Sequence, residues 1–321
     1  MRTTAGQPAP VWQVAAVGLP ALAVVLLWTA SDGGYHPVDW YPGAVLLLAL
    51  TLAAWLGVGA SPARLATSAR VALGALALYV GWSYASVLWA ATPGDALTGS
   101  NRALAYLLAF ALCVRLDWTA QRLRLVLGAY VAGIGVIAIA TLAQLATGPA
   151  PQLLFNGQLA APLGYHNATA ALGSVAALTA IALGSRRDLG IWPRAALAAI
   201  ATAGLELALL AQSRGWLYTL PIAATVLIAL SPSRMRTAAW AAIPAGAALL
   251  ALPWILHGYA AADGIGLTPT ADAVARADVA SARAALAAVL VSAVVAAALA
   301  HADRRGALAR RRVGLRRAAT A

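Results

Sequence analysis

Apolar runs long enough to cross a lipid bilayer follow one another along almost the whole chain, and they constrain its fold more than any other feature. Crossing the hydrocarbon core takes about 20 residues in a helix, and backbone groups in lipid must form their hydrogen bonds within their own segment. The sequence therefore predicts an all-α, polytopic integral membrane protein with about ten transmembrane helices. The predicted runs are 11–30, 42–60, 71–91, 102–116, 125–147, 168–185, 195–212, 215–231, 237–256 and 283–301.

The scarcity of charge supports this reading. Only 10% of the 321 residues are charged, whereas 62% are hydrophobic, and the mean hydropathy is +0.79. A soluble protein carries roughly 25% charged residues. We expect most of the surface to face lipid, in the plasma membrane.

The arginines predict the orientation of the helices. All basic residues are arginine, and they lie in short clusters between apolar runs, which argues against nucleic acid as the partner despite the net charge of +12. Alternate loops, with both ends of the chain, hold 18 of the 22 arginines, and this places both termini in the cytoplasm.

We expect one transmembrane domain, 1–301, and a basic cytoplasmic tail, 302–321, that meets membrane lipids. A signal peptide is the alternative for the first run, but its length favours a retained helix. The opposite set of loops holds Arg102, Arg214, Arg276 and Arg283.

Two of these four arginines are predicted to bind an anion. Arg214, in the tight turn after Ser213, must lie close to the start of a helix, where free N–H groups and the helix dipole favour negative charge. Arg102 is expected near the outer end of the helix 102–116, after an external loop 92–101. A guanidinium matches phosphate oxygens two at a time. The alternative is that these side chains reach for the membrane interface or pair with a carboxylate.

Glu206 is the only glutamate of the chain, and it falls inside an apolar run. An unpaired carboxylate in hydrocarbon costs several kcal/mol, so we expect it to face the interior and to have a partner. Arg214 and Arg102 are the two candidates for that partner. A structural ion pair, a protonated acid and a role in handling protons or substrate all remain open.

The loop 148–167 contains polar residues and turns but no charge. Asn167 is the predicted N-cap of the helix that follows. His166 is a weak candidate for a catalytic base at the outer face, and simple solvation is the alternative. His36 and His257 lack ligand spacing around them, so no metal and no other cofactor is expected.

Four stretches resemble the O-antigen ligase and polymerase superfamily of bacterial envelope glycosyltransferases. Their order and their shared external placement carry the resemblance, which covers roughly residues 70–235. The stretches are WAATPGDAL at 89–97, RALAY at 102–106, PLGYHNA at 162–168 and QSRGW at 212–216.

The resemblance implies transfer of a glycan from an undecaprenyl diphosphate carrier at the outer face of the plasma membrane. It implies that Arg214 and Ser213 hold the diphosphate, with Arg102 and, by position only, Arg276. The last external loop, 257–282, is short and lacks the histidine-rich surroundings of the family's catalytic base. The chain thus resembles the first part of such an enzyme, and a second membrane subunit is a possible partner. The alternatives are a noncatalytic scaffold subunit and a transporter of small solutes or lipid-linked molecules.

Overall fold

The computed structural model describes residues 11–57, 65–116, 118–155, 157–262 and 270–318. Helix makes up 86% of the structure, so the predicted all-α class is confirmed. One α-helix lies at each of the ten predicted runs in this part of the chain. Their bounds are α1 Val11–Ala30, α2 Pro37–Gly57, α3 Thr67–Ser86, α4 Pro93–Arg115, α5 Ala120–Thr147, α6 His166–Gly184, α7 Ile191–Leu210, α8 Arg214–Leu230, α9 Arg234–Ala262 and α10 Ala271–Ala318.

Eight of the described helices are long and apolar enough to cross a membrane. They are α2 to α7, α9 and α10, and they make the chain a multi-pass membrane protein. Two further apolar helices are shorter, Ala15–Ala30 and Arg214–Leu230. Helix α10 is 48 residues long, roughly 70 Å at 1.5 Å per residue, so it extends well beyond a hydrocarbon core of about 30 Å.

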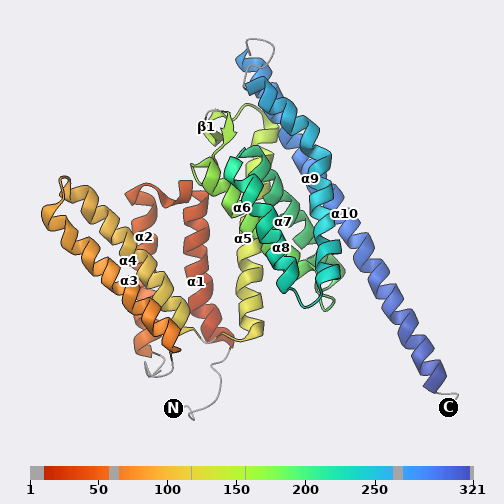
Figure 1. Ribbon diagram of the computed structural model, residues 1–321, viewed down its shortest axis with the longest axis horizontal. Helices are drawn as coiled ribbons and strands as arrows, with labels where there is room; N and C mark the ends of the chain where they lie inside the picture. Colours follow the sequence, from red (N-terminus) through yellow and green to blue (C-terminus); the bar gives the residue numbers. More distant parts are fainter. Residues whose placement is uncertain (1–10, 58–64, 117, 156, 263–269, 319–321) are drawn as a thin grey trace. The chain divides into compact units, whose positions relative to one another are not determined.

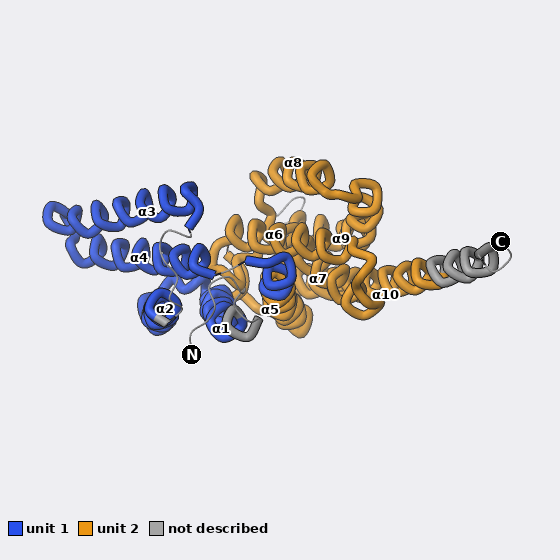
Figure 2. Tube along the Cα trace, turned by 90° about the horizontal axis from the view of Figure 1, so that it is seen from below, with its two compact units in different colours: residues 1–126 blue, residues 127–321 orange. Residues whose placement is uncertain are grey.

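Residues 1–126 form the first of two compact units, shown in blue in Figure 2. Within it α1 packs on α2, α2 on α4, and α4 on α3. Its buried core is small and consists of four residues, Val24, Leu47, Ala54 and Leu112. Polar side chains supplement it: the Ser83 and Ser100 hydroxyls lie 2.9 Å apart, and Tyr84 donates to Asn101 at 2.6 Å.

Residues 127–321 form the second unit, in which α7 is the central helix. It contacts α6, α9 and α10, and the long blue helix α10 runs beside α9 in Figure 1. A two-stranded hairpin follows α5, with β1 Leu154–Phe155 antiparallel to β2 Gln158–Leu159. Gly173 of α6 meets Gly204 of α7, and a Cβ on either would collide with the other's carbonyl oxygen. The two helices approach this closely because neither glycine has a side chain.

Two predicted external loops are instead largely helical. Pro93 opens α4 nine residues before the predicted start, because its fixed φ suits the first turn of a helix. The segment 257–282 belongs to α9 up to Ala262 and to α10 from Ala271. Its alanine-rich stretch has high helix propensity, which a criterion based on hydropathy does not detect. Residues 263–269, and the predicted cytoplasmic residues Arg2 and Arg64, lie outside the described part of the chain.

Candidate functional site

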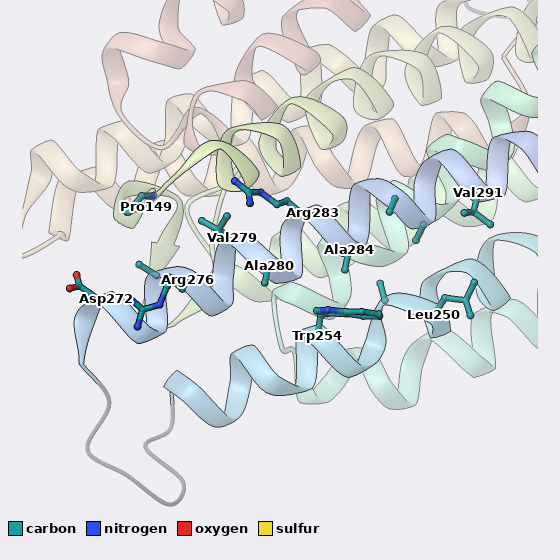
Figure 3. Close-up of a pocket in the computed structure, with 14 residues that line it drawn as sticks. Pro149, Leu250, Trp254, Asp272, Arg276, Val279, Ala280, Arg283, Ala284 and Val291 are labelled. Atoms are coloured by element: carbon teal, nitrogen blue, oxygen red, sulfur yellow. The ribbon is translucent and has the colours of Figure 1, made fainter.

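A groove of about 1000 Å³ lies between α9 and α10 in the second unit. Figure 3 shows that α10 contributes Arg276 and Arg283 to its lining, whereas Trp254 and Leu250 come from α9. Pro149, which follows α5, closes one edge. Much of the remaining lining is alanine and valine, so the groove is apolar with its charges gathered toward the start of α10.

The two groove arginines are seven residues apart, so they lie two turns apart on one side of α10, roughly 10 Å along its axis. Arg283 donates from Nε to the carbonyl oxygen of Ala146 at 3.0 Å, which leaves its two Nη groups for a ligand. Arg276 is exposed and makes no ion pair with a described residue, although Asp272 is one turn away. Both guanidinium groups can therefore receive phosphate oxygens.

Arg214 is the first residue of α8, as its turn predicted. The Ser213 side chain is the N-cap and accepts a hydrogen bond from the Trp216 amide at 3.3 Å. The Trp216 indole donates to the Ser174 hydroxyl of α6 at 2.5 Å and fixes this turn against the bundle. Arg214 itself is exposed and has no partner among the described residues, so it is free to hold an anion.

Arg102 lies in the first unit and differs from its prediction. It is more than two turns inside α4 rather than at the helix end. It donates to the carbonyl oxygen of Tyr35 at 2.5 Å, and its guanidinium carbon lies 5.8 Å from the Tyr35 ring and 5.6 Å from the Trp40 ring. These contacts hold the start of α2 against α4.

Glu206 is fully buried in α7, as predicted, but among the described residues neither Arg214 nor Arg102 pairs with it. Neither carboxyl oxygen has a hydrogen-bond partner among the described residues. Tyr259 of α9 is close enough to interact electrostatically, yet its hydroxyl donates to the Leu209 carbonyl. Nearby, Tyr259 and Asp278 line a cavity of about 10 Å³, roughly enough for one water molecule.

His166 and Asn167 open α6, and the predicted cap is wrong. The helix begins two residues earlier, its N-cap is Tyr165, and no side chain caps it. Asn167 instead donates to the Tyr165 hydroxyl at 2.6 Å. The His166 ring packs on Tyr165 with centroids 4.9 Å apart, and its Nδ1 is buried without a partner in the described structure. No group of three or more metal-ligating side chains occurs in the described ranges.

The structure thus brings together a different set of residues from the one predicted. Arg276 belongs to the groove, but its neighbours there are Arg283 and Trp254 rather than Arg214. Arg283 is not among the predicted site residues. Its seven-residue spacing from Arg276 places the two on one side of a helix, but the predicted external loop 257–282 gives that spacing no structural meaning.

No known family model matches the chain, and neither a curated protein nor a solved structure matches it.

Proposed function

We propose that the chain acts in bacterial envelope polysaccharide assembly and binds an undecaprenyl diphosphate-linked glycan at the outer face of the plasma membrane for glycosyl transfer. The observation that carries this proposal is the groove between α9 and α10, where two arginines stand at one end of an apolar lining. A lipid-linked diphosphate has the same separation of charged and apolar parts, because its charge is concentrated at one end of a long hydrocarbon chain. The resemblance of four sequence stretches, in the same order, to the O-antigen ligase and polymerase superfamily is the second support for this proposal.

In this proposal, Arg276 and Arg283 hold the diphosphate and the isoprenoid chain follows Trp254, Leu250 and Val291. Guanidinium groups that face the diphosphate would stabilise the charge that develops as it leaves the sugar. Arg214 does not line the groove, and we propose it as a separate anion contact because it has no partner among the described residues at the start of α8. The base that activates the acceptor remains unassigned, with His166 the candidate that carries an unpaired ring nitrogen.

We also propose that all ten helices cross the membrane, with both termini in the cytoplasm. The described part of α1 and all of α8 are the two shorter cases. The 17 residues of α8 span roughly 26 Å, a mismatch that local thinning of the bilayer accommodates. Enzyme reporters fused after residues 35 and 321 should report external and cytoplasmic positions respectively.

The test is binding of undecaprenyl diphosphate-linked glycan to the purified chain in detergent. We expect Arg276→Ala and Arg214→Ala each to weaken binding, by roughly tenfold for a lost charge-assisted contact. Ala287→Trp should also weaken it, because Ala287 lines the groove and a bulky side chain would fill it. The matched controls are Arg124→Ala, which removes an exposed arginine elsewhere, and Ala298→Trp, which adds the same bulk outside the groove lining.

Loss of binding in the groove variants with intact binding in both controls would support the donor site. Equal binding by all five variants would contradict the groove as that site. No binding by the parent chain would favour the noncatalytic scaffold.

A second candidate function is transport, and Glu206 is the observation that favours it. A buried carboxyl group without a hydrogen-bond partner is a common device for proton or ion coupling within a membrane. The test compares proton release from vesicles that contain the parent chain with release from vesicles that contain the Glu206→Gln variant. Release with the parent alone would favour transport over glycosyl transfer.

A further inference from the structure

A second cavity, of about 720 Å³, lies at the opposite end of the second unit from the start of α10. It is formed by the turn 231–233 between α8 and α9 together with the segment that follows α6. Arg187 comes from that segment, and Arg234 and Arg236 come from the first turn of α9. None of these residues lines the groove between α9 and α10, and none takes part in the proposed binding of the lipid-linked glycan.

The positive charge of this basic pocket is not neutralised by acids. No aspartate or glutamate lines it. Asp188, the residue that follows Arg187, is paired with Arg186 at 2.7 Å, an interaction that raises the pKa of Arg186. Arg187 and Arg234 are exposed and have no partner among the described residues.

The remaining arginine and two hydroxyls fix the shape of the pocket. Arg236 donates from Nη1 to the Ser185 carbonyl oxygen at 3.2 Å, which ties α9 to the end of α6. The hydroxyls of Ser231 and Thr237 lie 2.6 Å apart and close the turn. Helix α9 begins at Arg234 in the lining of the pocket, so the positive end of its dipole adds to the arginine charge there.

Apolar side chains at its rim place this pocket at the boundary between lipid and water. Leu230, the last residue of α8, is 79% exposed, and Met235 in the first turn of α9 is 84% exposed. Trp192, close to the start of α7 at the same end, is 80% exposed, as expected for an aromatic residue in the interfacial belt. A ligand held by the arginines would therefore have hydrocarbon directly beside its charged group.

We infer that the pocket formed by Arg187, Arg234 and Arg236 binds the phosphate headgroup of an anionic phospholipid. Basic pockets between transmembrane helices on the cytoplasmic side are suited to such headgroups. The guanidinium forks hold the phosphate oxygens, and the acyl chains lie against Leu230 and Met235. A soluble anion would use the arginines but would leave these two apolar side chains without contacts.

The test is titration of the purified full chain with phosphatidylglycerol and, separately, phosphatidylcholine, followed by native mass spectrometry. We expect phosphatidylglycerol to bind the parent at least about tenfold more tightly, since each arginine near an anionic headgroup contributes measurably. Arg187→Gln/Arg234→Gln should remove most of that preference, roughly tenfold in affinity. Neither side chain forms a hydrogen bond or an ion pair with another described residue, so this variant should keep the parent's melting temperature.

The matched control is Arg124→Gln/Arg305→Gln, which removes two exposed arginines outside the pocket. It should leave the preference for phosphatidylglycerol unchanged. Equal losses in both variants, or equal binding of the two lipids by the parent, would overturn the inference. Displacement of phosphatidylglycerol by millimolar inorganic phosphate would reassign the pocket to a soluble anion.

Discussion

Helices α3 and α7 are the same length and have similar hydropathy, 1.6 and 1.4, yet they occupy opposite environments. Each contains 20 residues. In α7, 61% of the most apolar 18-residue stretch is buried within the protein, whereas in α3 the share is 6%. Apolarity alone therefore does not distinguish a central helix from a peripheral one in a membrane protein.

The two helices differ in where their small residues lie, because those of α7 make up half of its buried face. Six of the twelve buried residues of α7 are alanine or glycine, and they let α6, α9 and α10 approach its backbone. In lipid, helices associate through such close packing because there is no hydrophobic drive to bring them together. Helix α3 instead directs Leu78, Tyr79 and Trp82 outward, and all three are more than half exposed.

The strongest test of this contrast is a pair of glycine substitutions. Gly204→Leu should destabilise the protein by about 3 kcal/mol, because its side chain would meet the Gly173 carbonyl, which cannot move aside. Gly81→Leu should cost nothing, since a Cβ on this α3 glycine meets no atom within 4 Å. The measurement is the free energy of unfolding from an SDS titration in mixed micelles. Equal effects at both positions would break the comparison.

A second pair compares buried and lipid-facing leucines. Leu142 of α5 is 0% exposed in the core of the second unit, whereas Leu78 of α3 is 76% exposed. Leu142→Ala should lower the free energy of unfolding by about 2 to 3 kcal/mol through the cavity it leaves. Leu78→Ala should lower it by less than about 0.5 kcal/mol, as for other exposed positions. The same titration measures both, and a larger loss at Leu78 would mean that another surface covers α3.

A third comparison is between two arginines of the second unit. The side chain of Arg194 is 4% exposed, and its guanidinium carbon lies 4.4 Å from the centroid of the Trp240 ring. Its Nη1 forms a salt bridge with the Asp303 carboxylate at 3.1 Å. Arg194→Leu should cost about 1 to 2 kcal/mol, because this cation is desolvated over the ring. Arg186→Leu should cost less than about 1 kcal/mol, since its pair with Asp188 is at the surface. Melting temperatures of the two variants would show the difference, and an equal fall would contradict it.

A small effect is also expected at Glu206. Because its carboxyl oxygens have no partner in the described structure, Glu206→Gln removes no hydrogen bond and keeps the side-chain volume. The free energy of unfolding should change by less than about 1 kcal/mol. A loss of about 3 kcal/mol or more would instead reveal a charged partner for this carboxylate.

The sequence by itself determined the class of the protein and the approximate place, but not the ends, of each α-helix in its described part. Runs of apolar residues leave the backbone no alternative to helix in lipid, and the ten predicted runs each contain one. The sequence also placed Arg214 at the start of α8 and buried Glu206 in α7. Both followed from local facts, a turn of a few residues and the cost of a carboxylate in hydrocarbon.

Tertiary structure decided which residues share a site. The groove joins Trp254 of α9 to Arg276 and Arg283 of α10, and the basic pocket joins Arg187 to Arg234. These combinations depend on which helices lie side by side, and apolar periodicity carries no such information when lipid and protein are equally apolar. The central position of α7 could not be predicted from the sequence for the same reason. It depends on small residues that meet across helices, such as Gly204 and Gly173, rather than on hydropathy.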